Sequence, residues 1–270
     1  MASKASTGAW CRIGLGFAVL AAALAMAGFA RGEVAQKDNV RLAFDVELSP
    51  HALPRHRPVP ISISFSGKIS AVNGASPPRV RRLTVGFNRR GAISTRGLPV
   101  CRAGALQSVT TKEALARCRG ALLGRGYFAA YIAFPTAGFP VRGPALAFNG
   151  RRGGRPVILL HVKVSRPVQA ALVLEMKVTH PTQGEFGTVL STTVPKLAGG
   201  AGYLTGLELT LDRRYRFGGR THSFVSASCA APAGFSVAVF TLAQGSFEFA
   251  DGQHARVALT RTCRVSDAGA

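Results

Sequence analysis

The chain has 270 residues and a formal net charge of +22, with 34 Lys and Arg against 12 Asp and Glu. Hydrophobic residues make up 47% of it and charged residues only 17%, which is too apolar for a disordered basic tail. The composition therefore indicates a folded, strongly basic protein and excludes an ordinary near-neutral cytosolic enzyme.

Residues 1–30 have the layout of a secretory signal peptide. Lys4 and Arg12 precede an uncharged apolar run over 13–29, and small residues follow it. This run is slightly shorter than the roughly 20 residues that a helix needs to cross a bilayer. We expect cleavage near Ala27 or Ala30, with an uncleaved N-terminal anchor as the alternative. Both outcomes place the remaining chain outside the cytoplasm, either secreted or at the extracytoplasmic cell surface.

Removal of the signal peptide leaves four cysteines, an even number in an oxidising compartment. We therefore expect two disulfides among Cys101, Cys118, Cys229 and Cys263. Three connectivities are possible, and pairing of sequence neighbours (Cys101 with Cys118, Cys229 with Cys263) is the simplest. No Cys-x-x-Cys pair or Cys/His ligand spacing is present, so neither a metal nor a cofactor is expected.

Alternation of apolar and polar residues runs through most of the mature chain and predicts strands with one buried face. In chain order, these strands are expected at 40–48, 61–66, 82–87, 172–178, 207–212, 235–242, 247–249 and 257–263. One segment differs: Thr110 and Glu113 form a capping-box pattern, which predicts a short helix near 111–119. The predicted fold is all-β, a two-sheet β-sandwich-like architecture with this one helix.

No linker or shift of composition divides the mature chain. Residues 31–270 are therefore expected to form a single β-rich exported domain, because all-β domains of this length often remain undivided. The alternative is a split near 135–143, which would leave one cysteine pair on each side.

Arginine supplies 27 of the 34 basic residues. Guanidinium groups bind phosphates and carboxylates bidentately, so the expected partner is an anionic cell-wall polymer or a membrane surface. The alternative is a solvated surface whose arginine bias reflects a GC-rich genome. Nucleic acid is not expected, because export removes the usual target and few aromatic residues remain for base stacking. The main groups are Arg79, Arg81, Arg82, Arg89 and Arg90; Arg151, Arg152 and Arg155; and Arg213, Arg214, Arg216 and Arg220.

The residues that usually carry catalysis form no convincing set. Asp45 and Glu47 lie on one face of a predicted strand, at a spacing compatible with a glycosidase pair, but they fit a solvent-facing strand better. His222 precedes Cys229 by seven residues, which suggests a cysteine nucleophile, but a disulfide to Cys263 uses that cysteine more plausibly. We assign no catalytic, cofactor-binding or metal-binding residue.

Tyrosines are the remaining candidates for a ligand surface. Carbohydrate-binding sandwiches present exposed aromatic rings, and the mature chain offers Tyr127, Tyr131, Tyr203 and Tyr215. Tyr203 and Tyr215 are the two candidates for a ligand face, although strand tyrosines are more often half-buried packing residues.

Several short segments, taken together, resemble a family of exported proteins of unknown activity from GC-rich, actinobacterial-type Gram-positive bacteria. The resemblance covers residues 39–265, and it implies export and a structural role for the four cysteines. It implies no activity, ligand or partner. The segments are 49–55 (SPHALPR), 95–101 (TRGLPVC), 146–150 (LAFNG), 187–188, 209–211, 213–215 and 229–235 (CAAPAGF).

The sequence thus predicts a secreted or surface-retained, non-catalytic binding or structural protein of the cell envelope, held by arginine contacts to anionic polymer. The alternative is an exported hydrolase that acts on wall or environmental polymer through an unrecognised site.

Overall fold

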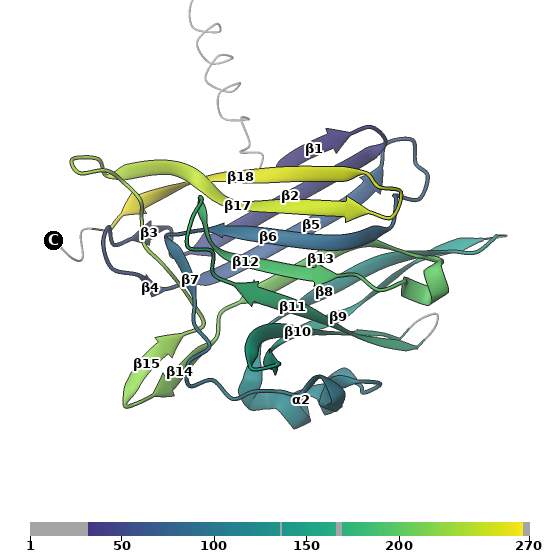
Figure 1. Cartoon of the computed structure of the whole chain (residues 1–270), viewed down its shortest axis with the longest axis horizontal. Coiled ribbons are helices and arrows are strands. Elements are labelled where there is room, and N and C mark those ends of the chain that lie inside the picture. The colour runs from purple at the N-terminus through teal and green to yellow at the C-terminus, as the bar shows by residue number, and fades with distance from the viewer. Residues whose placement is uncertain (1–31, 136, 166–168, 267–270) are drawn as a thin grey trace, which may run out of the picture. The chain divides into compact units, whose positions relative to one another are not determined.

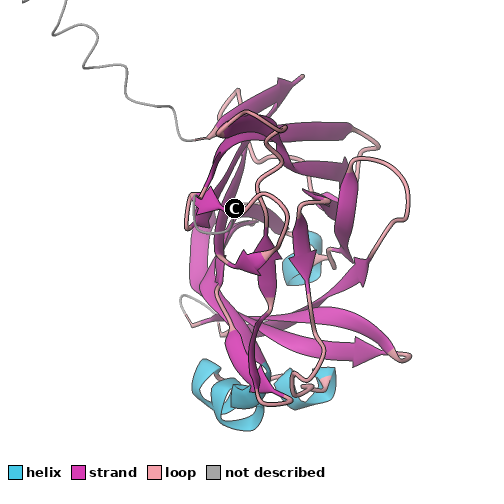
Figure 2. Ribbon diagram, turned by 90° about the vertical axis from the view of Figure 1, so that its left-hand side faces the viewer, coloured by secondary structure: helices cyan, strands magenta, loops and turns pink. Residues whose placement is uncertain are grey.

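The computed structural model describes residues 32–135, 137–165 and 169–266, so the predicted signal peptide lies outside the described residues. Most of the described chain is strand (Figure 2). The strands of the main sheet are β1 (Glu33–Lys37), β2 (Val40–Ser49), β3 (Ala52–Leu53), β5 (Ser62–Ala71), β6 (Val80–Asn88), β8 (Leu122–Ala133), β9 (Gly138–Arg152), β10 (Arg155–Val164), β11 (Ala170–Thr179), β12 (Phe186–Thr193), β13 (Gly202–Leu211), β17 (Val237–Phe249) and β18 (His254–Val265).

These thirteen strands form one curled sheet, in the order β1-β2-β5-β13-β8-β9-β10-β11-β12-β6-β17-β18-β3 (Figure 1). The curl brings β18 back into contact with β1 and β2, and hydrogen bonds and an ion pair from side chains stabilise this contact. The backbone N–H of Thr260 donates to the carboxylate of Glu33 at 2.7 Å, and Arg261 pairs with Asp45. The all-β class is as predicted. The expected separation into two facing sheets is not what the strand order gives, because hydrogen-bonded neighbours run continuously from β1 to β3.

Smaller elements lie around this sheet. The remaining strands form a two-stranded hairpin and a three-stranded sheet, and the helical turns gather mainly at one end (Figure 2). They are the hairpin β14 (Arg214–Phe217) and β15 (Arg220–Ser223); the small sheet β4 (Val59–Pro60), β16 (Val225–Ala227) and β7 (Gly91–Ile93); helix α2 (Thr111–Cys118); and 3-10 turns η1 (Ala103–Leu106), η2 (Arg119–Ala121) and η3 (Leu197–Gly200).

The main hydrophobic core fills the inside of the curl. Alternation turns one face of each strand inward, so Val40, Leu42, Phe44 and Val46 of β2 are at most 5% exposed. The strands predicted at 40–48, 82–87, 172–178 and 257–263 fall within β2, β6, β11 and β18. The stretches predicted at 235–242 and 247–249 belong mostly to one continuous strand, β17.

A second core lies on the outer face of β9 and β10. Leu146, Phe148, Val157 and Leu159 are buried there beneath residues 94–121, which we call the platform. Because β10 and residues 145–150 of β9 are buried on both faces, these stretches are nearly continuous apolar runs without alternation. This is why no strand was predicted at either place. Strand β8, which pairs with β9, was not predicted either.

Two disulfides are present, Cys101 with Cys118 and Cys229 with Cys263, in the connectivity that the sequence favoured. The first closes the platform and the second lies in the main core. From Gly32 onward the chain forms one compact unit. Strands β8 and β9, on either side of 135–137, pair with each other within the main sheet.

Candidate functional site

The hairpin β14–β15 is attached firmly to the platform. Gly218 and Gly219 form its tip with φ of 57° and 75°, the left-handed conformation that a two-residue hairpin turn requires. The hydroxyl of Tyr215 donates to the backbone carbonyl of Arg96 at 2.7 Å, and Tyr215 is only 8% exposed. Phe217 packs on Gly97, where a Cβ atom would lie 2.3 Å from the Phe217 ring. These contacts fix two segments that are more than 110 residues apart in the sequence.

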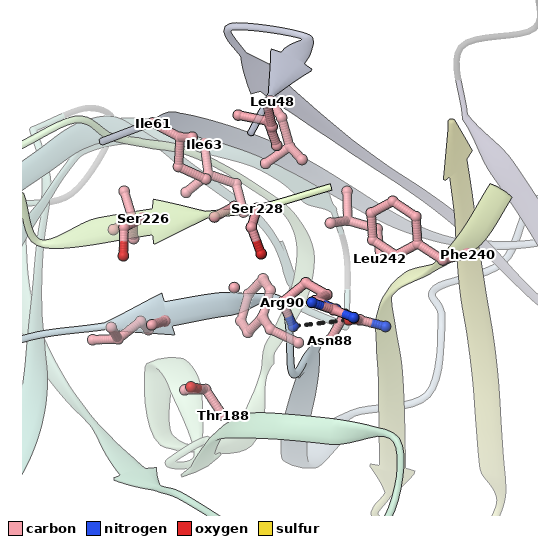
Figure 3. A pocket seen from close by; sticks show the side chains of 17 residues that line it. Leu48, Ile61, Ile63, Asn88, Arg90, Thr188, Ser226, Ser228, Phe240 and Leu242 are labelled. Atoms are coloured by element: carbon pink, nitrogen blue, oxygen red, sulfur yellow. Dashed lines mark hydrogen bonds between the residues drawn. The ribbon is translucent and has the colours of Figure 1, made fainter. Parts of the chain in front are cut away.

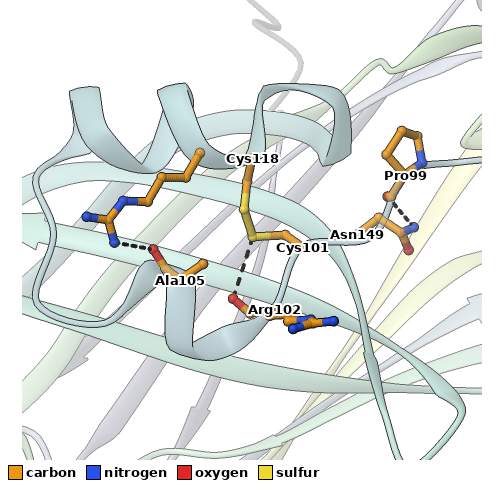
Figure 4. Close-up of a disulfide and its surroundings, with 7 residues drawn as sticks. Pro99, Cys101, Arg102, Ala105, Cys118 and Asn149 are labelled. Carbon is orange, nitrogen blue, oxygen red and sulfur yellow. Dashed lines mark hydrogen bonds between the residues drawn. A yellow bond between two sulfur atoms is a disulfide. The ribbon is translucent and has the colours of Figure 1, made fainter.

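The platform is braced by contacts of its own, and Figure 4 shows those around its disulfide. The hydroxyl of Thr110 accepts from the backbone N–H of Glu113, and the Glu113 carboxylate accepts from the backbone N–H of Thr110, which is the predicted capping box of α2. At the other end, the Cys101–Cys118 disulfide ties α2 to the segment after β7. The side-chain amide of Asn149 on β9 donates to the carbonyl of Pro99 at 2.9 Å. The platform therefore holds its side chains on a fixed backbone.

Platform and hairpin together present a strongly basic surface, which we call the basic end: residues 94–121 and 212–223. Its cationic side chains far outnumber its two acids, Glu113 and Asp212. Hydrogen bonds from the backbone and side chain of Thr110 lower the pKa of Glu113, so this acid serves the helix cap. The basic residues are Arg96, Arg102, Lys112, Arg117, Arg119, Arg213, Arg214, Arg216 and Arg220.

The guanidinium groups of the basic end are free of acidic partners within the described residues. Ion pairs among those residues involve arginines elsewhere: Arg81, Arg82, Arg142, Arg152 and Arg261. At the basic end, Arg117 donates to the carbonyl of Ala105 and Arg213 to that of Gly120, both at 3.3 Å. Arg214, Arg216 and Arg220 are exposed, so this end is suited to bind an extended anion.

The other arginine groups predicted from sequence are partly engaged in structural contacts. Arg81 and Arg82 share Glu248, and Arg152 pairs with Glu175 at 2.7 Å. Arg79 donates to the carbonyl of Gly200 at 2.8 Å. The sequence identified the arginine group at 213–220. It did not show that this group belongs to the same surface as Arg96, Arg102, Arg117 and Arg119, because no local signal in the sequence indicates which distant segments lie together.

The structure separates the proposed nucleophile pair. Cys229 is bonded to Cys263 and is fully buried, while the Nε2 atom of His222 lies 3.2 Å from the carbonyl oxygen of Phe217. Asp45 and Glu47 lie on the outer face of β2, as expected of a solvent-facing strand, and Asp45 is held by Arg261. These residues therefore form no arrangement typical of a hydrolase.

The tyrosines are distributed differently from the prediction. Tyr215, one of the two candidates for a ligand face, is buried as a support for the hairpin. Tyr127, which was not predicted to lie on a ligand face, is 52% exposed on the outer face of β8.

One cavity opens between the small sheet β4-β16-β7 and the inner face of the main sheet. Figure 3 shows its lining, which is almost entirely apolar and includes Leu48, Ile61 and Leu242; Asn88 and Ser226 are among its few polar residues. Its volume is about 40 Å³, which accommodates a few water molecules and no polymer segment. The cavity is therefore a weaker candidate than the basic end.

Within the described residues, no group of three or more His, Cys, Asp or Glu side chains could hold a metal ion. None of the helices in this part of the chain is long and apolar enough to cross a membrane. No family model, curated protein or solved structure matches the chain.

Proposed function

We propose that this protein is an exported, non-catalytic binding protein that attaches to an anionic polymer of the cell envelope through its basic end. The observation that carries the proposal is the set of exposed guanidinium groups on Arg214, Arg216 and Arg220, which have no acidic partner among the described residues. Phosphate-bearing wall polymer is the favoured partner, because planar guanidinium groups bind phosphate oxygens bidentately.

Export is part of this proposal. The apolar N-terminal segment and the two disulfides support an extracytoplasmic site of action, because disulfides persist in oxidising compartments. A rigid backbone at the basic end also supports binding, since side chains on an ordered scaffold lose less conformational freedom when they bind.

Support for the alternative, an exported hydrolase, is weaker. A glycosidase needs two carboxyl groups free to act on one bond, one of them as a proton donor. On the outer face of the sheet, Asp45 is ion-paired with Arg261 and Glu208 with Arg142, so both acids are already engaged.

The proposal is tested by sedimentation of the purified protein with peptidoglycan sacculi that carry phosphate polymer, against sacculi stripped of it with hydrofluoric acid. We expect binding to intact sacculi at about 0.1 M salt and release at about 1 M, where the Debye length falls from about 10 Å to about 3 Å. Equal binding to both kinds of sacculi would contradict the proposal. Preference for anionic lipid vesicles over intact sacculi would assign the basic end to a membrane surface instead.

A charge-matched pair of variants locates the contact. The triple change R214S/R216S/R220S removes three charges from the hairpin and is expected to lower the affinity for intact sacculi at least tenfold. The control R41S/R256S/R264S removes three exposed arginines from β2 and β18, and we expect less than a threefold loss. Equal losses in both variants would show that net charge, rather than the basic end, governs binding.

A further inference from the structure

A second open site lies on the outer face of the main sheet. A groove of about 660 Å³ runs over strands β2, β5, β13 and β8, with Pro144 of β9 and Thr111 of α2 at one side. This groove differs from the small cavity in Figure 3, because its volume can hold several sugar rings and ten of its fifteen lining residues are polar. Apart from Thr111, its lining also lies outside the residues that define the basic end.

The strand register aligns polar side chains across the groove in two adjacent rows. In one row Asp45, Ser66, Glu208 and Tyr127 are successive cross-strand neighbours. The parallel row carries Glu47, Ser64, Thr210 and Arg125. Neighbouring strands lie about 4.8 Å apart, so hydrogen-bonding groups recur across the groove at that interval. The hydroxyl groups of Ser64 and Thr210 form a hydrogen bond with each other at 2.8 Å.

Tyr127 provides an exposed ring at the side of this array. The guanidinium carbon of Arg142 lies 4.7 Å from the centre of the Tyr127 ring, and Arg142 also pairs with Glu208 at 3.2 Å. Tyr127 nevertheless remains 52% exposed. Further along β8, Tyr131 lies on the same outer face, opposite Tyr203 of β13. The outer face therefore carries three of the four tyrosines of the chain.

The charge balance of the groove distinguishes it from the rest of the protein. Its lining holds three acids, Asp45, Glu47 and Glu208, against two bases, Lys68 and Arg125. In the whole chain, basic residues outnumber acidic ones by nearly three to one. A polyanion would meet carboxylates here. Sugar hydroxyl groups, in contrast, can donate to the acceptor sites that the ion pairs of Asp45 with Arg261 and of Glu208 with Arg142 leave open, and they can accept from guanidinium groups.

We propose that this groove binds a neutral oligosaccharide, with one sugar ring stacked on Tyr127 and hydroxyl groups bonded to the two polar rows. The carboxylate, hydroxyl and guanidinium groups of these rows supply the acceptors and donors that sugar hydroxyl groups require. An exposed aromatic ring matches the apolar face of a pyranose. The basic end and the groove would then recognise the charged and neutral parts of envelope polysaccharide separately.

The test uses immobilised neutral hexasaccharides of glucose, mannose, galactose and N-acetylglucosamine, with uronic-acid hexasaccharides as the acidic set. Binding of the purified protein is measured by biolayer interferometry in about 1 M NaCl, which screens exposed charges beyond about 3 Å. We expect binding to at least one neutral glycan under these conditions. Binding to none of them, or to acidic glycans alone, would overturn the proposal.

Two variants place the binding in the groove. Y127A is expected to weaken the affinity for the neutral glycan about tenfold, since it removes the stacking surface. The control F235A removes the aromatic side chain of a 64% exposed loop residue outside the groove, and its affinity should be unchanged. Unchanged affinity in Y127A, or equal losses in both variants, would refute the assignment. If the groove binds no neutral glycan, the proposal for the basic end is unaffected. It is tested separately by low-salt binding to phosphate polymer and by the loss of that binding in R214S/R216S/R220S.

Discussion

The two faces of the curled sheet are built in different ways. The inner face is apolar across nearly all strands and forms one continuous core. The outer face is apolar chiefly where the platform covers β9 and β10, and it is polar along the groove over β2, β5, β13 and β8. The disulfides follow this division, because Cys229–Cys263 belongs to the inner core and Cys101–Cys118 to the outer one.

This difference indicates how stability and binding are divided. Burial of the inner face supplies most of the hydrophobic stabilisation, which scales with apolar area removed from water. The outer face adds a small second core that fixes the basic end, and it leaves exposed the polar array in the groove. Substitutions on the inner face should therefore unfold the chain, whereas those on the outer face should alter local order or binding.

The sharpest comparison uses adjacent residues of β13 that face opposite ways. Leu211 is 2% exposed in the inner core, and Thr210 lines the groove. L211A should lower the free energy of unfolding by about 2–5 kcal/mol, because it leaves a cavity. T210A loses the hydrogen bond to Ser64 and should cost about 1 kcal/mol. Urea denaturation measures both, and similar losses would contradict the assignment of the two faces.

Removal of the outer disulfide tests whether the platform is a separate unit. For cysteines 17 residues apart, the chain-entropy relation gives a loss of about 3 kcal/mol in C101A/C118A. We expect trypsin to cut the native variant after Arg102, Lys112 or Arg117 while the main sheet stays folded. The change C229A/C263A, which opens the inner core, provides the comparison.

If C101A/C118A is cut at sites throughout the chain at the same rate as within the platform, the platform is not independent of the sheet. Cleavage confined to the platform would instead show that the platform unfolds at a lower free energy than the inner core does.

The sequence predicted those parts of the fold whose signals are local. Strand β2 alternates Val40, Leu42, Phe44 and Val46 with more polar residues, and Thr110 with Glu113 marks the start of α2. Strands β9 and β10 carry no such alternation, because the platform buries their outer face. The curl of the sheet was also not predictable, since strand order depends on pairings between distant segments.

The candidate sites were predictable to a smaller extent. The arginines at 213–220 stand out in the sequence, but the hydrogen bond from Tyr215 to Arg96 that builds the basic end spans 119 residues. Asp45 and Glu47 were noticed as a pair on one strand. Their association with Glu208 and Tyr127 arises only from the order β2-β5-β13-β8.

The smallest expected effect concerns His161, which lies on the outer face of β10 beneath the platform. It is fully buried, and its Nε2 atom lies 3.1 Å from the carbonyl oxygen of Val109, so the neutral ring donates its proton there. The Nδ1 atom has no partner among the described residues. Burial lowers the pKa of His161 below its ordinary value of 6.5; the hydrogen bond to Val109 opposes this shift, and the charge of Lys163 on the same strand adds to it. Helix α2 packs against the same core through Ala114, and the charged residues next to Ala114 in the sequence are Glu113 and Lys112.

A lowered pKa means that the unfolded chain binds a proton more readily than the folded one. The contribution of neutral His161 to stability is therefore complete above pH 6.5 and decreases as the pH falls through that value. H161Q keeps a donor for Val109 and does not titrate, so its stability should lack this step. Unfolding free energies of both proteins between about pH 7.5 and about pH 5 give the difference directly. Parallel curves would show that the ring has the same pKa in the folded and unfolded chains, and that the platform does not seal the outer core.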